Sequence, residues 1–231
     1  IVHCSRSAWY FRRDSLMAIQ DIKHIGLFRV DFMRFVLDLD HKAIAEYTIE
    51  HSKKWDRYTT YHDRSLNDDW AKGMPGREEF VGTLTKAANE FVERTSRRPF
   101  EGAQGGHYLY YWVSLYKKHD QHGTHNHPNS LLAGTYYPLT GPNSSPILLE
   151  APWDSHIMHD TLPATEASMR IKPNTGDMIM WPSWVKHRVP AQETDEPRIA
   201  ISFNFDYGRY HQDEGLGIGN MKDKVGHLSH D

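Results

Sequence analysis

The sequence predicts a mainly β fold, a sandwich or a barrel-like jelly roll, with two helices before it. Up to residue 106 the apolar residues recur at helical spacing, whereas short aromatic and β-branched runs separated by Pro, Gly and Asn follow. Six or more such runs with turn signals between them favour two packed sheets or a closed barrel. The two helices are then available to cover an outer face of a sheet.

The first helix is predicted in DHKAIAEYTIEHSKKW, which begins at Asp40. Helical spacing places Ile44, Tyr47 and Trp55 near one face. Asp38 or Asp40 can act as the N-cap, because a short carboxylate accepts a free N–H of the first turn.

The second helix is predicted over residues 77–95, REEFVGTLTKAANEFVERT. Its first turn is acidic, and MPG at 74–76 breaks the chain before it. Its apolar residues recur at 3.6-residue spacing: Phe80, Leu84, Ala87, Ala88, Phe91 and Val92. The intervening segment 56–70, DRYTTYHDRSLNDDW, is polar and is predicted to be a long loop.

Strands are predicted over 107–116, 131–138, 146–150, 168–172, 177–182 and 197–207. Two of these strands alternate clearly. In HYLYYWVSLY, residues 109, 111, 113 and 115 share one face, and the aromatic residues at 108, 110, 112 and 116 share the other with Ser114. In RIAISFNF, Arg198 lies on the polar face of an otherwise apolar strand.

Composition excludes several classes of protein. Hydrophobic residues make up 39% and charged residues 25% of 231, as in ordinary globular proteins, and no run approaches the length of a membrane span. The single cysteine, Cys4, argues against thiol chemistry. A net charge of -3 with interspersed signs gives no reason to expect nucleic acid or anionic membranes as partners. The start of the sequence lacks a long apolar signal region, and we expect a cytoplasmic protein.

Histidine is the compositional outlier, with 16 residues, four of them in HDQHGTHNHPNS at 119–130. His125 and His127 are separated by one residue, so on an extended chain both project to the same face and can share a metal ion. His122 can replace His125 in a shifted frame, and His119 is expected to face water. The other interpretation is a polar loop that binds no metal.

Two later residues strengthen the metal interpretation. His187 follows the strand and turn GDMIMWPSWVK, and a β-sandwich can bring it beside the first pair. Arg198 begins the strand eleven residues further on. Taken alone, Arg198 is more typical of an edge strand, with its charge in a surface ion pair to Asp195 or Glu196.

The order of these motifs resembles the 2-oxoglutarate- and Fe(II)-dependent oxygenases. It is most similar to a small group with H-x-H-P-N-S, an SGVYY-like strand, GDLVLFPSWLxHxV and RISISFN. The corresponding segments are HNHPNSLLAGTYY, GDMIMWPSWVKHRV and RIAISFN. The resemblance is specific over residues 108–207 and extends to IGLFRVDF at 25–32. It implies a cupin-like double-stranded β-helix with an iron site in its mouth.

The resemblance also implies the domain boundaries and the ligands. We expect an extension at 1–24, one oxygenase domain at 25–207 with a helical annex (25–106) and a jelly-roll core (107–207), and a polar tail at 208–231. It implies Fe(II) held by His125, His127 and His187, with 2-oxoglutarate in two positions and O2 in one. Relatives usually have a carboxylate as the middle ligand, so the identity of the second ligand is open, and Asp120 is an alternative.

Arg198 is the residue that the resemblance assigns to the distal carboxylate of 2-oxoglutarate, because a guanidinium binds a carboxylate through two hydrogen bonds. Relatives usually share that carboxylate with a Ser or Thr two positions on, where this chain has Ala200. Ser202 or Tyr136 can compensate. Asn129, directly after the metal motif, can orient the co-substrate or form a turn.

Tyr110 and Trp112 are candidate substrate contacts, and an equal interpretation places them in the core. Trp153 lies in a long loop between strands, where substrate recognition often resides.

The predicted function is therefore hydroxylation of an unactivated C–H bond in a small molecule or in an amino-acid or peptidyl side chain, with release of succinate and CO2. The alternatives are a three-histidine cupin-type dioxygenase that does not use 2-oxoglutarate, and a non-catalytic jelly-roll module that binds a metal or ligand.

Overall fold

The computed structural model describes residues 30–95, 108–152 and 168–206. The chain divides into residues 1–30 and 31–231, and all described helices and strands lie in the second part. The predicted extension at 1–24, the predicted tail at 208–231 and Trp153 lie outside the described residues.

The helical part begins with a short strand. Its elements are β1 (Met33–Val36), α1 (His41–His51), the single-turn 3-10 helix η2 (Ser52–Lys54), α2 (Arg64–Gly73) and α3 (Arg77–Thr95). The two predicted helices, α1 and α3, are confirmed. Asp40 is the N-cap of α1, where its carboxylate accepts the N–H of Ala43 at 2.9 Å.

Helix α2 begins within the segment 56–70 that was predicted to be a loop, and that prediction is wrong from residue 64 onward. Asp63 caps this helix by accepting the N–H of Leu66 at 2.9 Å. The helix buries only Asn67, Trp70 and Ala71. Such a narrow apolar stripe, with one aromatic residue, gives little periodic signal in the sequence.

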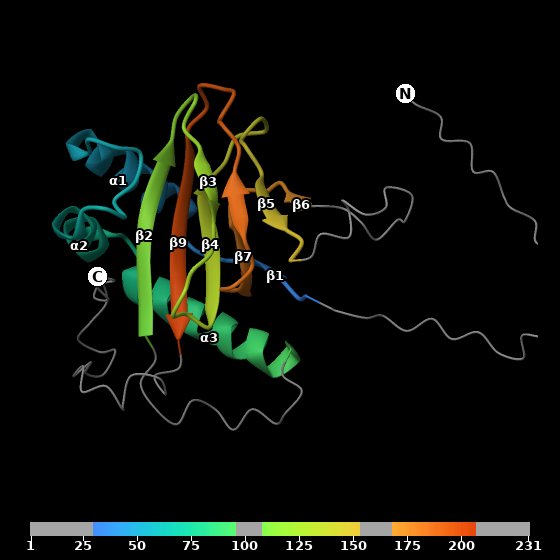
Figure 1. Cartoon of the computed structure of the whole chain (residues 1–231). Coiled ribbons are helices and arrows are strands. Elements are labelled where there is room, and N and C mark those ends of the chain that lie inside the picture. The colour runs from blue at the N-terminus through green and yellow to red at the C-terminus, as the bar shows by residue number, and fades with distance from the viewer. Residues whose placement is uncertain (1–29, 96–107, 153–167, 207–231) are drawn as a thin grey trace, which may run out of the picture. The chain divides into compact units, whose positions relative to one another are not determined.

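Strands after residue 107 form two antiparallel sheets (Figure 1). They are β2 (Tyr108–Tyr116), β3 (His122–His125), β4 (Leu132–Leu139), β5 (Ile147–Glu150), β6 (Ser168–Ile171), β7 (Asp177–Pro182), β8 (His187–Val189) and β9 (Arg198–Asp206). The larger sheet has the order β1-β7-β4-β9-β2, and the smaller has the order β3-β8-β5-β6. The predicted jelly roll is confirmed, and β1 joins the larger sheet as an edge strand that was not predicted.

The core lies between the larger sheet and the helices. Strands β2 and β9 pair along their whole length, from Tyr108 opposite Asp206 to Tyr116 opposite Arg198. The predicted alternation is confirmed, because every second residue of these two strands joins the core: Leu109, Tyr111, Val113, Leu115, Ile199, Ile201, Phe203 and Phe205. The intervening residues therefore face the other sheet.

The helices cover one face of the larger sheet, as Figure 1 shows. Trp70 of α2 and Phe80 of α3 both meet the ring of Tyr111 edge-on, with centroids 6.1 and 5.6 Å apart. The opposite face of the sheet is left for the smaller sheet and for the space between them. Within the described part of the chain, no helix combines the length and the apolar character that crossing a membrane requires.

Candidate metal centre and adjoining cavity

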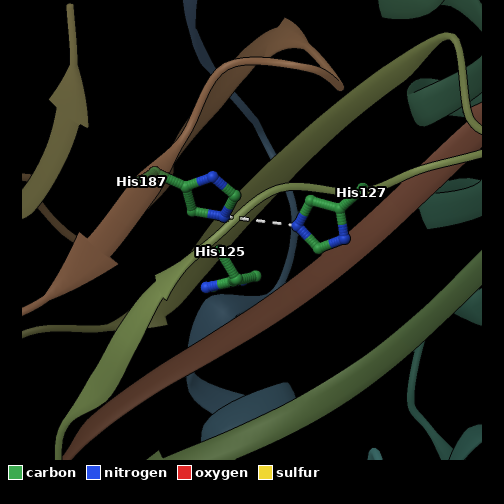
Figure 2. A group of neighbouring side chains, drawn as sticks. All are labelled: His125, His127 and His187. Atoms are coloured by element: carbon green, nitrogen blue, oxygen red, sulfur yellow. Dashed lines mark hydrogen bonds between the residues drawn. The ribbon is translucent and has the colours of Figure 1, made fainter.

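Three histidines meet between the two sheets. His125 ends β3, His127 follows two residues later, and His187 begins β8. Their metal-binding nitrogens all lie within 4.8 Å of one another, and Figure 2 shows the three rings gathered around one point. The sequence prediction that these residues come together is confirmed.

Strand pairing explains this convergence. His125 and His187 are direct partners in the antiparallel ladder of β3 and β8, so their side chains lie side by side on one face. The chain leaves β3 before His127, whose backbone N–H donates to the carbonyl of Ser183 at 3.0 Å. That bond ties the segment after β3 to the turn before β8 and places the third ring.

Backbone carbonyls fix the orientation of two of the rings. Nδ1 of His125 lies 2.8 Å from the Gly123 carbonyl, and Nδ1 of His187 lies 3.1 Å from the Val185 carbonyl. A carbonyl can only accept, so each Nδ1 carries the proton and each Nε2 presents a lone pair. Nε2 of His187 points to Nε2 of His127 at 3.2 Å (Figure 2).

Burial favours the neutral form of two of these imidazoles. Burial, together with the neighbouring His125, lowers the pKa of His187 to about 3. Burial also lowers the pKa of His125. Neutral imidazoles are the form that binds a transition metal, so the cluster suits iron, zinc, copper or nickel and not a hard, oxygen-preferring cation.

The alternative ligands from the sequence do not join the cluster. The carboxylate of Asp120 accepts the N–H of Lys117 at 2.7 Å and closes a turn. His122 lies beside His125, with ring centroids 4.3 Å apart, but outside the group of three.

A cavity of about 410 Å³ adjoins the histidines and is open to solvent. Its walls come from both sheets, with the three histidines and His122 on one side. The larger sheet contributes Trp112, Ser114 and Tyr116 of β2 and Arg198, Ala200 and Ser202 of β9.

Arg198 is a buried cation without a counter-charge in the described part of the chain. Its side chain is 1% exposed, and its Nε and Nη1 atoms have no hydrogen-bond partner. The rings of Tyr116 and Tyr137 lie 4.6 and 5.0 Å from the guanidinium carbon. Ring faces alone cannot satisfy directional N–H donors, so the guanidinium is suited to an anion that enters the cavity.

The surface ion pair considered for Arg198 is not formed. Asp195 pairs with Lys118 at 3.6 Å, and the carboxylate of Glu196 accepts the N–H of Asn143 at 3.4 Å. Both acidic residues are used elsewhere, while Arg198 faces the cavity between the sheets.

Tyr136 was predicted to contact the co-substrate, and the structure places it on the other face of β4. It belongs to the core beneath the helices, where its hydroxyl bonds to Nδ1 of His41. Its neighbours Thr135 and Tyr137 line the cavity instead. Tyr137 is fully buried, its hydroxyl has no hydrogen-bond partner, and burial raises its pKa to about 12. Because side chains alternate along a strand, a prediction that is wrong by one residue names the opposite face of β4.

Asn129 forms a turn and does not line the cavity. Its φ of 62° is in the left-handed region that asparagine tolerates, and its side chain is exposed. Ser202 does line the cavity, with its hydroxyl 3.3 Å from that of Thr135. Of the two proposed compensations for Ala200, only Ser202 is in place to contact a ligand.

The aromatic residues of β2 are divided between the cavity and its surroundings. Trp112 lines the cavity, with its ring centroid 5.8 Å from that of His127. Tyr110 packs behind Trp112 at 5.3 Å. Tyr61, which the sequence did not single out, lies 4.9 Å from Trp112 and is 37% exposed. An aromatic wall therefore runs from the surface to the histidines.

Comparison with known proteins agrees with this geometry. Residues 110–204 match a family model described as "Putative 2OG-Fe(II) oxygenase". Over these residues the chain is similar to the 2OG-Fe(II) oxygenases that the model describes. The match contains the three histidines and Arg198, and Fe(II) and 2-oxoglutarate are the cofactor and co-substrate after which this family is named. No curated protein matched the chain.

Solved structures that resemble this chain include one with a TM-score above 0.5, which shares its fold. AviO1 from Streptomyces viridochromogenes is 17% identical with a TM-score of 0.53, over 77% of this chain and 90% of that one. HygX from Streptomyces hygroscopicus, solved with nickel and 2-oxoglutarate, is 11% identical with a TM-score of 0.49, over 87% and 93%. A 2OG-Fe(II) oxygenase family protein from Burkholderia pseudomallei is 12% identical with a TM-score of 0.41, and the chain spans 59% of its length.

Proposed function

We propose that this chain uses Fe(II), 2-oxoglutarate and O2 to hydroxylate an unactivated C–H bond. The substrate is a small molecule or an amino-acid or peptidyl side chain, and the other products are succinate and CO2. The observation that carries the proposal is one cavity with three imidazoles on one wall and, on another, a buried guanidinium whose Nε and Nη1 atoms have no hydrogen-bond partner.

The residues present fit both groups. Three imidazole nitrogens fill half of an octahedral coordination sphere and leave room for a chelating oxo acid and O2. Fe(II) brings two positive charges to the site, which the dianion of 2-oxoglutarate balances. Arg198 adds a third positive charge to the cavity, which favours a dianion over a neutral ligand.

Each side chain has a defined task in this proposal. His125 and His187 present Nε2 to the metal while backbone carbonyls hold their Nδ1 protons, which prevents the rings from rotating. Arg198 receives the distal carboxylate through its unpartnered Nε and Nη1 atoms. The Tyr137 hydroxyl, which is protonated and unpartnered, is available to donate to the same carboxylate.

Fe(II) with 2-oxoglutarate and O2 supplies the oxidising power that replaces a C–H hydrogen with a hydroxyl group, as the oxo acid becomes succinate and CO2. The protein positions the reactants. Trp112, beside His127, forms the wall that a substrate meets next to the metal.

The test is an anaerobic titration of the Fe(II)-loaded protein with 2-oxoglutarate, followed by the weak visible charge-transfer absorption that chelation of the oxo acid produces. We expect the band in the wild type and its loss in the double variant His125→Ala/His187→Ala. In air, the loaded wild type should release succinate in proportion to the 2-oxoglutarate consumed.

Two other results of these experiments would contradict the proposed function. If iron binds but no band develops, a three-histidine dioxygenase that binds its substrate directly becomes the better description. If neither the wild type nor the double variant retains metal after purification from iron-supplemented cells, the cluster is not a metal site.

A further inference from the structure

His122 is a cavity residue that the proposed function does not use. It lies at the start of β3, three residues before His125, and its side chain lines the same cavity. Its ring is in contact with that of His125, with centroids 4.3 Å apart. One side of the imidazole is therefore directed at the ligand space next to the metal cluster.

Tyr58 holds the other side of this ring. Its hydroxyl lies 2.8 Å from Nδ1 of His122. Tyr58 is itself fixed, because its carbonyl accepts the N–H of Leu115 at 2.7 Å and its ring packs on Tyr116 at 5.0 Å. The segment that contains Tyr58 thus ties the edge strand of the larger sheet to the edge strand of the smaller one.

The tyrosine decides which nitrogen of His122 carries the proton. Burial raises the pKa of Tyr58 to about 12, so its hydroxyl keeps its proton. A phenol O–H is a strong donor and an imidazole nitrogen is a strong acceptor, so Tyr58 donates to Nδ1 of His122. Nε2 then carries the hydrogen and is left as a donor.

The contacts place this donor on the path of the co-substrate. A continuous series of side-chain contacts leads from His125 through His122, Tyr58 and Tyr116 to Arg198. Of this series, His125, His122, Tyr116 and Arg198 line the cavity, so an oxo acid that joins the metal to Arg198 has His122 within its surroundings. His122 is at the metal end of the series, where the 2-oxo acid group binds.

We propose that His122, oriented by Tyr58, donates a hydrogen bond to the 2-oxo acid end of the co-substrate. This inference rests on the proposed function. His122 is then a positioning residue, complementary to Arg198, which binds the opposite end of the molecule. The interaction should contribute to the affinity for any 2-oxo acid, with or without a distal carboxylate.

Two ligands distinguish the role of His122 from that of Arg198. 2-Oxoglutarate carries both ends, whereas pyruvate has the 2-oxo acid group and no distal carboxylate. Both are titrated anaerobically into Fe(II)-loaded wild type, His122→Leu, His122→Gln, Tyr58→Phe and Arg198→Met, with the charge-transfer absorption as readout. Bound iron is measured for every variant, so that a loss of metal is not mistaken for a loss of affinity.

We expect His122→Leu to weaken 2-oxoglutarate and pyruvate by the same factor, about ten- to a hundredfold for a lost hydrogen bond to a charged group. Tyr58→Phe should weaken both by a smaller common factor, because the donor remains but is no longer oriented. His122→Gln, which restores an N–H donor, should recover part of the loss. Arg198→Met should weaken 2-oxoglutarate alone.

The inference is overturned if His122→Leu binds both ligands as the wild type does, or if it weakens 2-oxoglutarate and leaves pyruvate unchanged. Should His122→Leu lose its iron, Tyr58→Phe and His122→Gln decide by the same criterion. If the wild type gives no charge-transfer band with 2-oxoglutarate, the proposed function is wrong, and the inference that rests on it is wrong as well.

Discussion

Replacing Arg198 by methionine should distinguish a role of the guanidinium in binding 2-oxoglutarate from a role in stabilising the fold. Arg198 is 1% exposed, two of its guanidinium nitrogens have no hydrogen-bond partner, and two tyrosine rings pack against the guanidinium. Methionine has a similar length and no charge to solvate. A buried arginine that stabilised the fold would have a carboxylate or several carbonyls around it.

Each buried donor without a hydrogen-bond partner costs about 1 to 3 kcal/mol of folding free energy, and two such atoms cost about 2 to 6. Each ring contact returns about 0.5 to 2 kcal/mol. We therefore expect Arg198→Met to leave the free energy of unfolding of the metal-free protein unchanged or to raise it by about 1 to 3 kcal/mol. Its affinity for 2-oxoglutarate should fall by about 2 to 5 kcal/mol, roughly thirty- to several-thousandfold.

The assay is urea denaturation of wild type and variant in EDTA, together with anaerobic 2-oxoglutarate titration of the Fe(II)-loaded forms. Arg198→Lys is the matched control. It keeps the charge but not the planar fork, so it should retain part of the affinity and none of the gain in stability.

A loss of 3 to 5 kcal/mol in the metal-free methionine variant would refute this reasoning. Such a loss is typical of breaking a buried, satisfied ion pair. It would mean that the guanidinium is already neutralised within the protein and is not held for an incoming anion.

Further predictions concern the metal, the packing and the corrected residue. Zn(II) should raise the melting temperature of the wild type and not that of His125→Ala/His187→Ala, and a shift in both would disprove the site. Gly134→Ala should lower the free energy of unfolding by about 1 to 3 kcal/mol, because its methyl group would lie 2.4 Å from a phenyl carbon and 2.7 Å from a carbonyl oxygen. Gly82→Ala, a control in α3 with open space around it, should raise it by about 0.5 to 1 kcal/mol in urea denaturation. Tyr136→Phe should leave the 2-oxoglutarate affinity unchanged, and a loss above threefold would restore Tyr136 to the site.

Much of the fold could be predicted because two periodicities are visible in the sequence. The 3.6-residue spacing of α3 and the alternation of β2 and β9 each reflect an element with one face in the core and another outside it. Strand β4 carries no such signal, since seven of its eight residues are buried on both faces. The sequence therefore does not show which residues of β4 face the cavity, and the prediction names Tyr136 although Tyr137 lines the cavity.

The sequence by itself determined the local part of the site. His125 and His127 are close because one residue separates them, and the alternation of its strand places Arg198 on the face opposite the core residues. Tertiary structure decided the rest. The pairing of β3 with β8 brings in His187, and the segment at Tyr58 turns His122 toward the ligand space. Such contacts join residues about sixty positions apart, and they depend on strand register and on backbone hydrogen bonds that no short pattern of residues records.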